Sequence, residues 1–170
     1  MQPHYIYSPR ELTRWKYAVY EALEPLEEPE DLARLYVHEG LRLFEDRLVY
    51  PHEKEWCNTT IDACVRRWFT GINTQKALER PIYFTTYLHR NYVSVGQEEL
   101  KDYIEARLKQ FQEEVLDVPL VVFDSVLDHI LRIDRVLRQP LGHLLLVGAS
   151  GVGKTTLTKF VSWINDLEVF

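Results

Sequence analysis

The fold of this 170-residue chain is decided by the stretch Gly148-Ala149-Ser150-Gly151-Val152-Gly153-Lys154-Thr155. The stretch matches the pattern G-x-x-x-x-G-K-[ST] at every fixed position. The apolar run at 143–147 before it predicts a β-strand, and the amphipathic run at 155–165 after it predicts an α-helix. A glycine-rich loop between a strand and a helix is typical of a phosphate-binding loop. The alternative is a glycine-rich turn that contains a lysine by coincidence.

The residue types of this loop predict its chemistry. Its glycines allow a tight turn that brings backbone N–H groups close to phosphate oxygens, and the helix that follows adds free N–H groups and its dipole. A lysine at this position suits the β- and γ-phosphates of a nucleotide, and the hydroxyl after it suits Mg²⁺. We therefore predict a site for ATP and Mg²⁺, with Thr155 as the Mg²⁺ ligand. Its residues are Gly148, Ala149, Ser150, Gly151, Val152, Gly153, Lys154, Thr155 and Thr156.

Composition narrows the class of protein. Hydrophobic residues make up 46% of the chain and charged residues 27%, which is typical of a globular protein in water. The net charge of −6 argues against nucleic-acid binding, and no apolar run approaches the roughly 20 residues that span a bilayer. Cys57 and Cys64 fall about two turns apart on one predicted helix, too far for a disulfide. We predict two reduced thiols and no zinc site.

A series of helices precedes the loop. Ser8, Pro9 and Glu11 form a helix start with a capping box. Apolar residues at helical spacing predict helices after Ser8 and over 30–48, 52–69, 97–115 and 120–137, and 81–85 reads as a short strand or an extended connector. This order predicts a mostly α fold, with a helical subdomain over 1–117 and the start of an α/β subdomain over 118–170. Because one strand leaves its backbone groups unpaired, we expect a piece of a larger protein.

Longer segments of the sequence resemble dynein heavy chains. The segments 5–15 and 38–48 resemble the first two helices of the lid of the third AAA+ module. The segments 116–123 and 127–135 look like the entry into the fourth module, and 142–148 leads into its phosphate-binding loop. The resemblance covers nearly the whole chain and is greater to cytoplasmic than to axonemal forms. It implies a helical AAA+ small subdomain followed by the incomplete start of a P-loop α/β (AAA+) large subdomain.

The resemblance also implies a function. The parent protein would be a ring of AAA+ modules that hydrolyses ATP and moves toward the minus end of microtubules in the cytoplasm. Its partners would be the rest of the heavy-chain ring, intermediate and light chains, and microtubules, without nucleic acid or membrane insertion. ATP at the loop would regulate or support conformational changes of the ring, and this segment alone would be inactive. The alternatives are a structural or regulatory segment without hydrolysis of its own, and an unrelated P-loop kinase or GTPase.

Two further groups of residues are assigned by position from the resemblance. The segment before the first strand would pack against adenine, through Val118, Pro119, Leu120 and Val121. These four are also compatible with buried aliphatics at an ordinary domain junction. Arg10 would be the sensor 2 arginine, which reaches the γ-phosphate held by the large subdomain of its own module. The alternative is a solvated arginine that pairs with Glu11 or Glu30.

Overall fold

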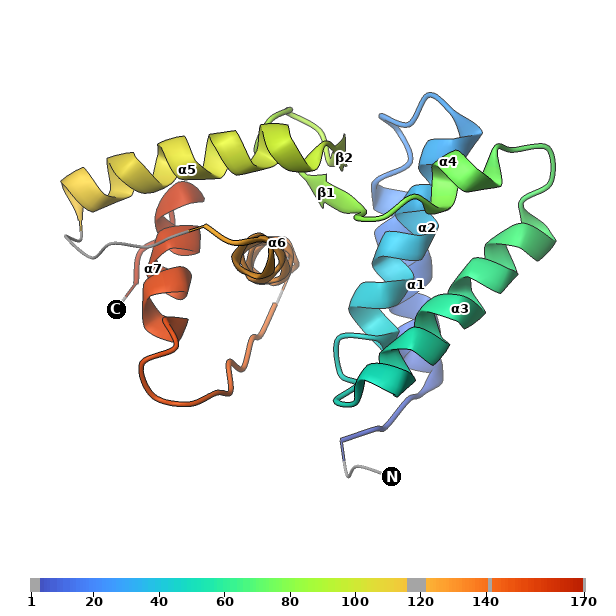
Figure 1. Cartoon of the computed structure of the whole chain (residues 1–170), viewed down its shortest axis with the longest axis horizontal. Coiled ribbons are helices and arrows are strands. Elements are labelled where there is room, and N and C mark those ends of the chain that lie inside the picture. Colours follow the sequence, from blue (N-terminus) through green and yellow to red (C-terminus); the bar gives the residue numbers. More distant parts are fainter. Residues whose placement is uncertain (1–3, 116–121, 141, 170) are drawn as a thin grey trace. The chain divides into compact units, whose positions relative to one another are not determined.

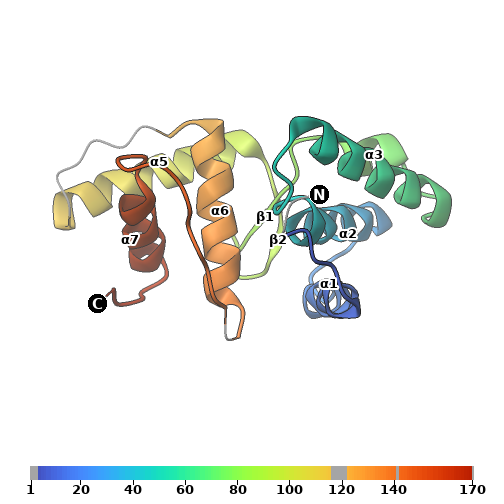
Figure 2. The same cartoon turned by 90° about the horizontal axis from the view of Figure 1, so that it is seen from below.

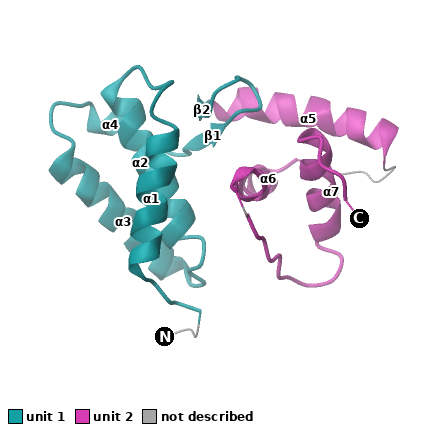
Figure 3. Ribbon diagram, turned by 180° about the vertical axis from the view of Figure 1, so that it is seen from behind, with its two compact units in different colours: residues 1–95 teal, residues 96–170 magenta. Residues whose placement is uncertain are grey.

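The computed structural model describes residues 4–115, 122–140 and 142–169. The chain forms two compact units, residues 1–95 and residues 96–170, coloured separately in Figure 3. The predicted fold class is confirmed, because the described residues form seven helices and a single two-stranded sheet. The predicted subdomain boundary at 117–118 falls in residues outside the description and stays a prediction.

The first unit is built around one central helix. Its helices are α1 (Pro9–Glu21), α2 (Pro29–Phe44), α3 (Pro51–Trp68) and the short α4 (Thr74–Leu78), and α2 packs against the other three (Figures 1 and 2). Proline begins α1, α2 and α3, where its missing N–H costs no helical hydrogen bond. The core of the unit consists of Ala22, Ala33, Leu35, Val37, Leu41, Cys57, Ile61, Val65, Ala77, Ile82 and Phe84.

A glycine on α2 allows α1 to approach closely. A Cβ atom on Gly40 would lie 2.7 Å from Cζ2 of Trp15, which is too close for two carbon atoms. The indole instead lies against the bare backbone, and its Nε1 donates a hydrogen bond to the carbonyl oxygen of Tyr36 at 2.9 Å. Its ring also stands 4.3 Å from that of Tyr36. These contacts fix α1 against α2.

A small antiparallel hairpin completes the first unit. Strand β1 (Tyr83–Thr85) pairs with β2 (Val93–Val95), with Tyr83 opposite Val95. The sequence was compatible with either a short strand or an extended connector at 81–85, and the structure shows a strand at Tyr83–Thr85. It did not predict β2 or α4, because runs of three and five residues are too short to show a periodicity.

A buried histidine joins α2 to this hairpin. Within the core, Nδ1 of His38 lies 3.2 Å from the carbonyl oxygen of Ile82, and Nε2 lies 3.1 Å from the hydroxyl of Tyr92. The Tyr92 hydroxyl donates to Oε1 of Glu39 at 3.2 Å. Oε1 of the Glu39 carboxylate lies 4.0 Å from Nε2 of His38. These contacts link α2 to the segments on either side of β1.

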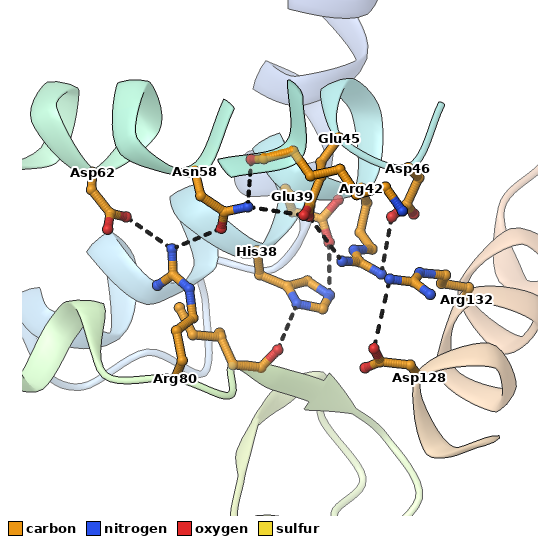
Figure 4. A network of polar contacts seen from close by, with 12 residues as sticks. His38, Glu39, Arg42, Glu45, Asp46, Asn58, Asp62, Arg80, Asp128 and Arg132 are labelled. Carbon is orange, nitrogen blue, oxygen red and sulfur yellow. Dashed lines mark hydrogen bonds and ion pairs between the residues drawn. The ribbon is translucent and has the colours of Figure 1, made fainter. Parts of the chain in front are cut away.

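Asn58 on α3 connects three parts of the first unit (Figure 4). Its Nδ2 donates to Oε1 of Glu45, just after α2, and to the carbonyl oxygen of Lys54, each at 2.9 Å. Its Oδ1 accepts a hydrogen bond from Arg80 at 3.4 Å, and Arg80 forms an ion pair with Asp62 at 2.8 Å. The end of α2, the middle of α3 and the connector before β1 are therefore held by one set of polar contacts.

The second unit contains α5 (Gln97–Glu114), α6 (Asp124–Arg138) and α7 (Lys154–Ile164), and α7 packs against both of the others. The α5–α7 contact is aromatic, with the ring of Phe111 5.5 Å from those of Phe160 and Trp163. The guanidinium of Arg107 lies 4.6 Å from the centre of the Trp163 ring. Of the helices in the described ranges, none is both long and apolar enough to cross a membrane.

The segment at 143–147 is not a strand in the structure, in contrast to the sequence prediction. A strand is stabilised by hydrogen bonds to a neighbouring strand, and among the described residues no segment pairs with this one. Its apolar side chains remain uncovered, with Leu145 85% and Val147 86% exposed. The apolar composition of this segment therefore suits a strand, but among the described residues no other strand pairs with it.

Candidate functional site

The loop before α7 has a backbone shape that requires glycine at two positions. Gly151 and Gly153 have φ angles of 83° and 81°, in the left-handed region that L-residues rarely adopt. Gly153 is also the N-cap of α7, so the chain turns sharply and then enters the helix directly. This turn leaves the unpaired N–H groups of the first helical turn at the loop, as a phosphate site requires.

Lys154 begins α7 and folds back over the loop. Its Nζ donates hydrogen bonds to the carbonyl oxygens of Gly148 and Ala149, at 2.8 Å and 2.6 Å. The ammonium group therefore lies at the concave backbone that the glycines create. Because both contacts are to neutral carbonyl groups at an exposed position, a phosphate oxygen of higher charge can replace them.

Two contacts hold α7 in place behind the loop. Phe160 and Val161 are fully buried in the second unit. At the far end of α7, Nδ2 of Asn165 donates to Oδ1 of Asp134 on α6 at 2.8 Å, and Asp134 also pairs with Arg138 at 2.8 Å. The C-terminal half of the helix that presents the loop is therefore anchored in the second unit.

The residues present fit a phosphate group with a bound Mg²⁺. Glycines in the left-handed conformation, a lysine ammonium and a helix N-terminus converge on one loop. Thr155 and Thr156 follow on the first turn of α7, and Thr155 is exposed. Magnesium prefers oxygen ligands such as a threonine hydroxyl, water and phosphate oxygens. The predicted adenine residues Val118, Pro119, Leu120 and Val121 lie outside the described residues.

Arg10 lies in the first unit, whereas the loop lies in the second. Arg10 occupies the second position of α1 and is exposed. The two carboxylates predicted as alternative partners of Arg10 make other contacts. Glu11 pairs with Arg47, and Glu30 accepts a hydrogen bond from the backbone N–H of Asn73 at 2.8 Å. Within the described residues, the Arg10 guanidinium forms no ion pair.

The predicted capping box next to Arg10 is confirmed. The backbone N–H and the hydroxyl of Ser8 both donate to Oε2 of Glu11, each at 2.8 Å. The Ser8 hydroxyl in turn accepts a hydrogen bond from the backbone N–H of Arg10 at 3.3 Å. These bonds from Ser8, assisted by the charge of Arg47, lower the pKa of the Glu11 carboxyl from 4.5 to about 2.

Replacing Glu11 with glutamine should change how the stability of the first unit depends on pH. A carboxyl whose pKa is lowered by folding stabilises the folded state above its unfolded pKa, and this contribution is lost as the pH falls toward the folded pKa. The stability difference between the wild type and Glu11→Gln should thus be full above about pH 4.5 and shrink as the pH approaches about 2. Chemical unfolding at a series of pH values measures it. Glu21→Gln, at the other end of α1, is the control, and a difference that stays constant over this range would contradict the expectation.

Two family models match segments of this sequence. The family described as "Dynein heavy chain, ATPase lid domain" matches residues 1–54, and the family described as "P-loop containing dynein motor region D4" matches residues 118–170. A cytoplasmic dynein heavy chain of Paramecium tetraurelia is 72% identical over 169 residues, which are 99% of this chain. The chain belongs to the dynein heavy chain family. It is a piece of the motor region, with lid residues before a phosphate-loop region.

Other dynein heavy chains agree with this assignment. The cytoplasmic dynein heavy chains of Drosophila melanogaster and Dictyostelium discoideum are 57% and 52% identical over 172 residues, and each match covers 100% of this chain. The chain spans only about 4% of the length of these relatives. The match to the phosphate-loop region includes the loop at 148–155, and the lid match includes Arg10, Glu11 and Arg47.

The contact between Arg47 and Glu11 could not be predicted from the sequence. Arg47 lies in the segment 38–48 that carries part of the dynein resemblance, but no spacing rule connects it with Glu11. Their contact forms only when the turn after α2 meets the start of α1. Only the folded arrangement could reveal it.

Proposed function

We propose that this chain is part of the motor ring of a cytoplasmic dynein heavy chain and that its residues 148–156 bind the phosphates of ATP together with Mg²⁺. The observation that carries the proposal is the loop conformation, with Gly151 and Gly153 in the left-handed region and Nζ of Lys154 against the loop backbone. The match of residues 118–170 to a P-loop dynein motor region supports it.

Each residue of the loop has a role in this proposal. The backbone N–H groups from Gly148 to Thr156 surround the phosphates, and Lys154 neutralises charge on the β- and γ-phosphates. The Thr155 hydroxyl holds Mg²⁺, which bridges phosphate oxygens. Val118, Pro119, Leu120 and Val121 pack against the adenine ring. Arg10 acts at a different nucleotide, the one bound by the module whose lid is the first unit, and there a guanidinium offers several donors to the γ-phosphate.

We assign the lid to the third module of the ring and the phosphate loop to the fourth. In this proposal, nucleotide at the loop regulates or supports conformational changes of the ring, and the lid of one module and the phosphate loop of the next lie on one polypeptide. The partners of the parent protein are the remaining modules of the heavy chain, the intermediate and light chains, and microtubules in the cytoplasm. The names of the relatives, which are cytoplasmic dynein heavy chains, support the assignment to a cytoplasmic dynein.

Replacing Gly153 with valine tests the observation that carries the proposal. A left-handed conformation costs an L-residue roughly 1–2 kcal/mol, and a β-branched residue tolerates it least. We expect ATP to bind this loop about 5- to 30-fold more weakly in a dynein heavy chain that carries the variant. Labelling with azido-ATP at increasing concentration, followed by peptide mapping, gives an affinity for this site alone.

Gly96 offers a matched control for Gly153. It is also the N-cap of a helix, and a Cβ atom added at either glycine would meet nothing within 4 Å. The two positions differ in backbone conformation, since Gly96 has a φ of −71°. Gly96→Val should therefore bind ATP as the wild type does. Equal affinities for the wild type and Gly153→Val would refute the proposed phosphate site.

A further inference from the structure

The start of α1 is joined to the turn after α2 through one arginine. Nη1 of Arg47 donates a hydrogen bond to the carbonyl oxygen of Ile6 at 2.6 Å, and Nη2 lies 3.6 Å from Oε1 of Glu11. The same guanidinium stands 4.8 Å from the centre of the Tyr7 ring. Arg47 thus contacts the chain before α1 and the first turn of α1 at the same time.

The contact continues from Arg47 to Arg10 through two intermediate residues. Glu11 uses one carboxylate oxygen for Arg47 and the other for the N–H and hydroxyl of Ser8. The Ser8 hydroxyl accepts from the backbone N–H of Arg10 at 3.3 Å. An unbroken series of polar contacts therefore leads from the turn after α2 to the backbone of Arg10.

The chain before α1 has other attachments that do not involve the Arg47 side chain. The Tyr7 hydroxyl donates to the carbonyl oxygen of Phe44 at 3.0 Å. The Tyr5 hydroxyl donates to the Glu53 carboxylate and accepts from the backbone N–H of Val49 at 2.8 Å. Loss of the Arg47 side chain would therefore leave this chain segment attached to α2 and α3. The structural change caused by this loss would therefore be largest at Glu11 and the first turn of α1.

The position of this turn matters if Arg10 binds phosphate. A guanidinium recognises phosphate oxygens through paired hydrogen bonds of defined direction. Helix ends fray, and an Arg10 backbone that moves would displace the guanidinium from its ligand. A misplacement of about 1 Å at a functional group can cost about 100-fold in activity. A fixed first turn is thus a requirement for a long side chain that must reach across to another subdomain.

We propose that Arg47 is a positioning residue for Arg10, because it fixes the first turn of α1 through Glu11 and Ser8. This inference rests on the proposed function, in which Arg10 contacts the γ-phosphate of the nucleotide bound by the module of this lid. The Arg47 guanidinium is occupied by Ile6, Tyr7 and Glu11, so its own contact with the nucleotide is not part of the proposal.

The test compares variants in a dynein heavy chain that contains this segment. Azido-labelled ATP and ADP are titrated, and labelled peptides from the third module report the affinity of that site. Arg10→Ala should weaken ATP about 10- to 100-fold and ADP much less, since only ATP has the γ-phosphate. Arg47→Ala should weaken ATP about 5- to 10-fold with the same preference, and Arg47→Lys should recover part of the loss. Arg47→Ala should have no further effect when Arg10 is already alanine.

Arg42→Ala is the matched control, because Arg42 forms its ion pairs with Glu45 and Asp46 at 3.8 Å and 3.3 Å. It should leave ATP affinity unchanged. Hydrogen exchange of the amides at 10–12 should accelerate in Arg47→Ala and not in Arg42→Ala. A normal ATP affinity in Arg47→Ala, an equal loss of ATP and ADP, or additive losses in the double variant would overturn the positioning role. A normal ATP affinity in Arg10→Ala would instead overturn the proposed role of Arg10 itself.

Discussion

Replacing Phe84 with alanine is expected to lower the free energy of unfolding of the first unit by about 3–5 kcal/mol. Phe84 lies on β1 and is only 2% exposed. Its ring stands 5.2 Å from the imidazole of His38 and 5.6 Å from the ring of Tyr92. The truncation would therefore remove apolar burial and leave a cavity beside the hydrogen-bonded histidine. Amide hydrogen exchange of α2 in the 170-residue chain measures the loss of stability of the first unit separately from the second.

Trp68 provides the control for this prediction. It is as large as any side chain of the unit, but it is 68% exposed at the end of α3. The guanidinium of Arg67 makes a cation–π contact with it, 4.9 Å from the centre of the Trp68 ring. A contact of this kind at an exposed site is worth about 0.5–1 kcal/mol, so Trp68→Ala should have a small effect. If the two variants were equally stable, the core assigned to this unit would be wrong.

The sequence predicted the local features of this fold well. The capping box of Ser8 and Glu11 depends on residues three positions apart, and the structure confirms it. The predicted starts of α2 and α3, at residues 30 and 52, lie next to the observed starts at Pro29 and Pro51, whereas the end of α2 was predicted at 48 and lies at Phe44. Such signals act within one turn of helix, so they do not depend on the rest of the protein.

Features that depend on distant contacts could not be predicted. The contact of Arg47 with Glu11 joins the turn after α2 to the start of α1, and no local pattern connects these two segments. At 143–147 the sequence predicted a strand that the structure does not show. The apolar sequence suits a strand, but among the described residues no other strand pairs with it. The pattern G-x-x-x-x-G-K-[ST] identified the residues of the loop. The structure shows in addition that Gly151 and Gly153 adopt the left-handed conformation.

Replacing Lys154 with alanine should cause the largest loss of nucleotide binding at this loop. A charged hydrogen bond contributes about 1.5–3 kcal/mol, so ATP should bind roughly 10- to 150-fold more weakly. The net effect is smaller than that of an isolated ammonium–phosphate contact, because Nζ first leaves the carbonyl oxygens of Gly148 and Ala149. Electron cryo-microscopy of the motor with ATP should show nucleotide at this loop in the wild type and not in the variant.

Lys159 lies on the same helix, outside the loop, and Lys159→Ala should keep the nucleotide. Nucleotide at the loop in the Lys154→Ala motor, at wild-type occupancy, would contradict the assigned role of Lys154. The same pair of variants separates regulation from force production. If nucleotide at this loop regulates the ring, microtubules should still glide over Lys154→Ala motors at a changed speed. If gliding stops in Lys154→Ala and continues in Lys159→Ala, this module takes part in producing movement, and the regulatory role proposed for it is wrong.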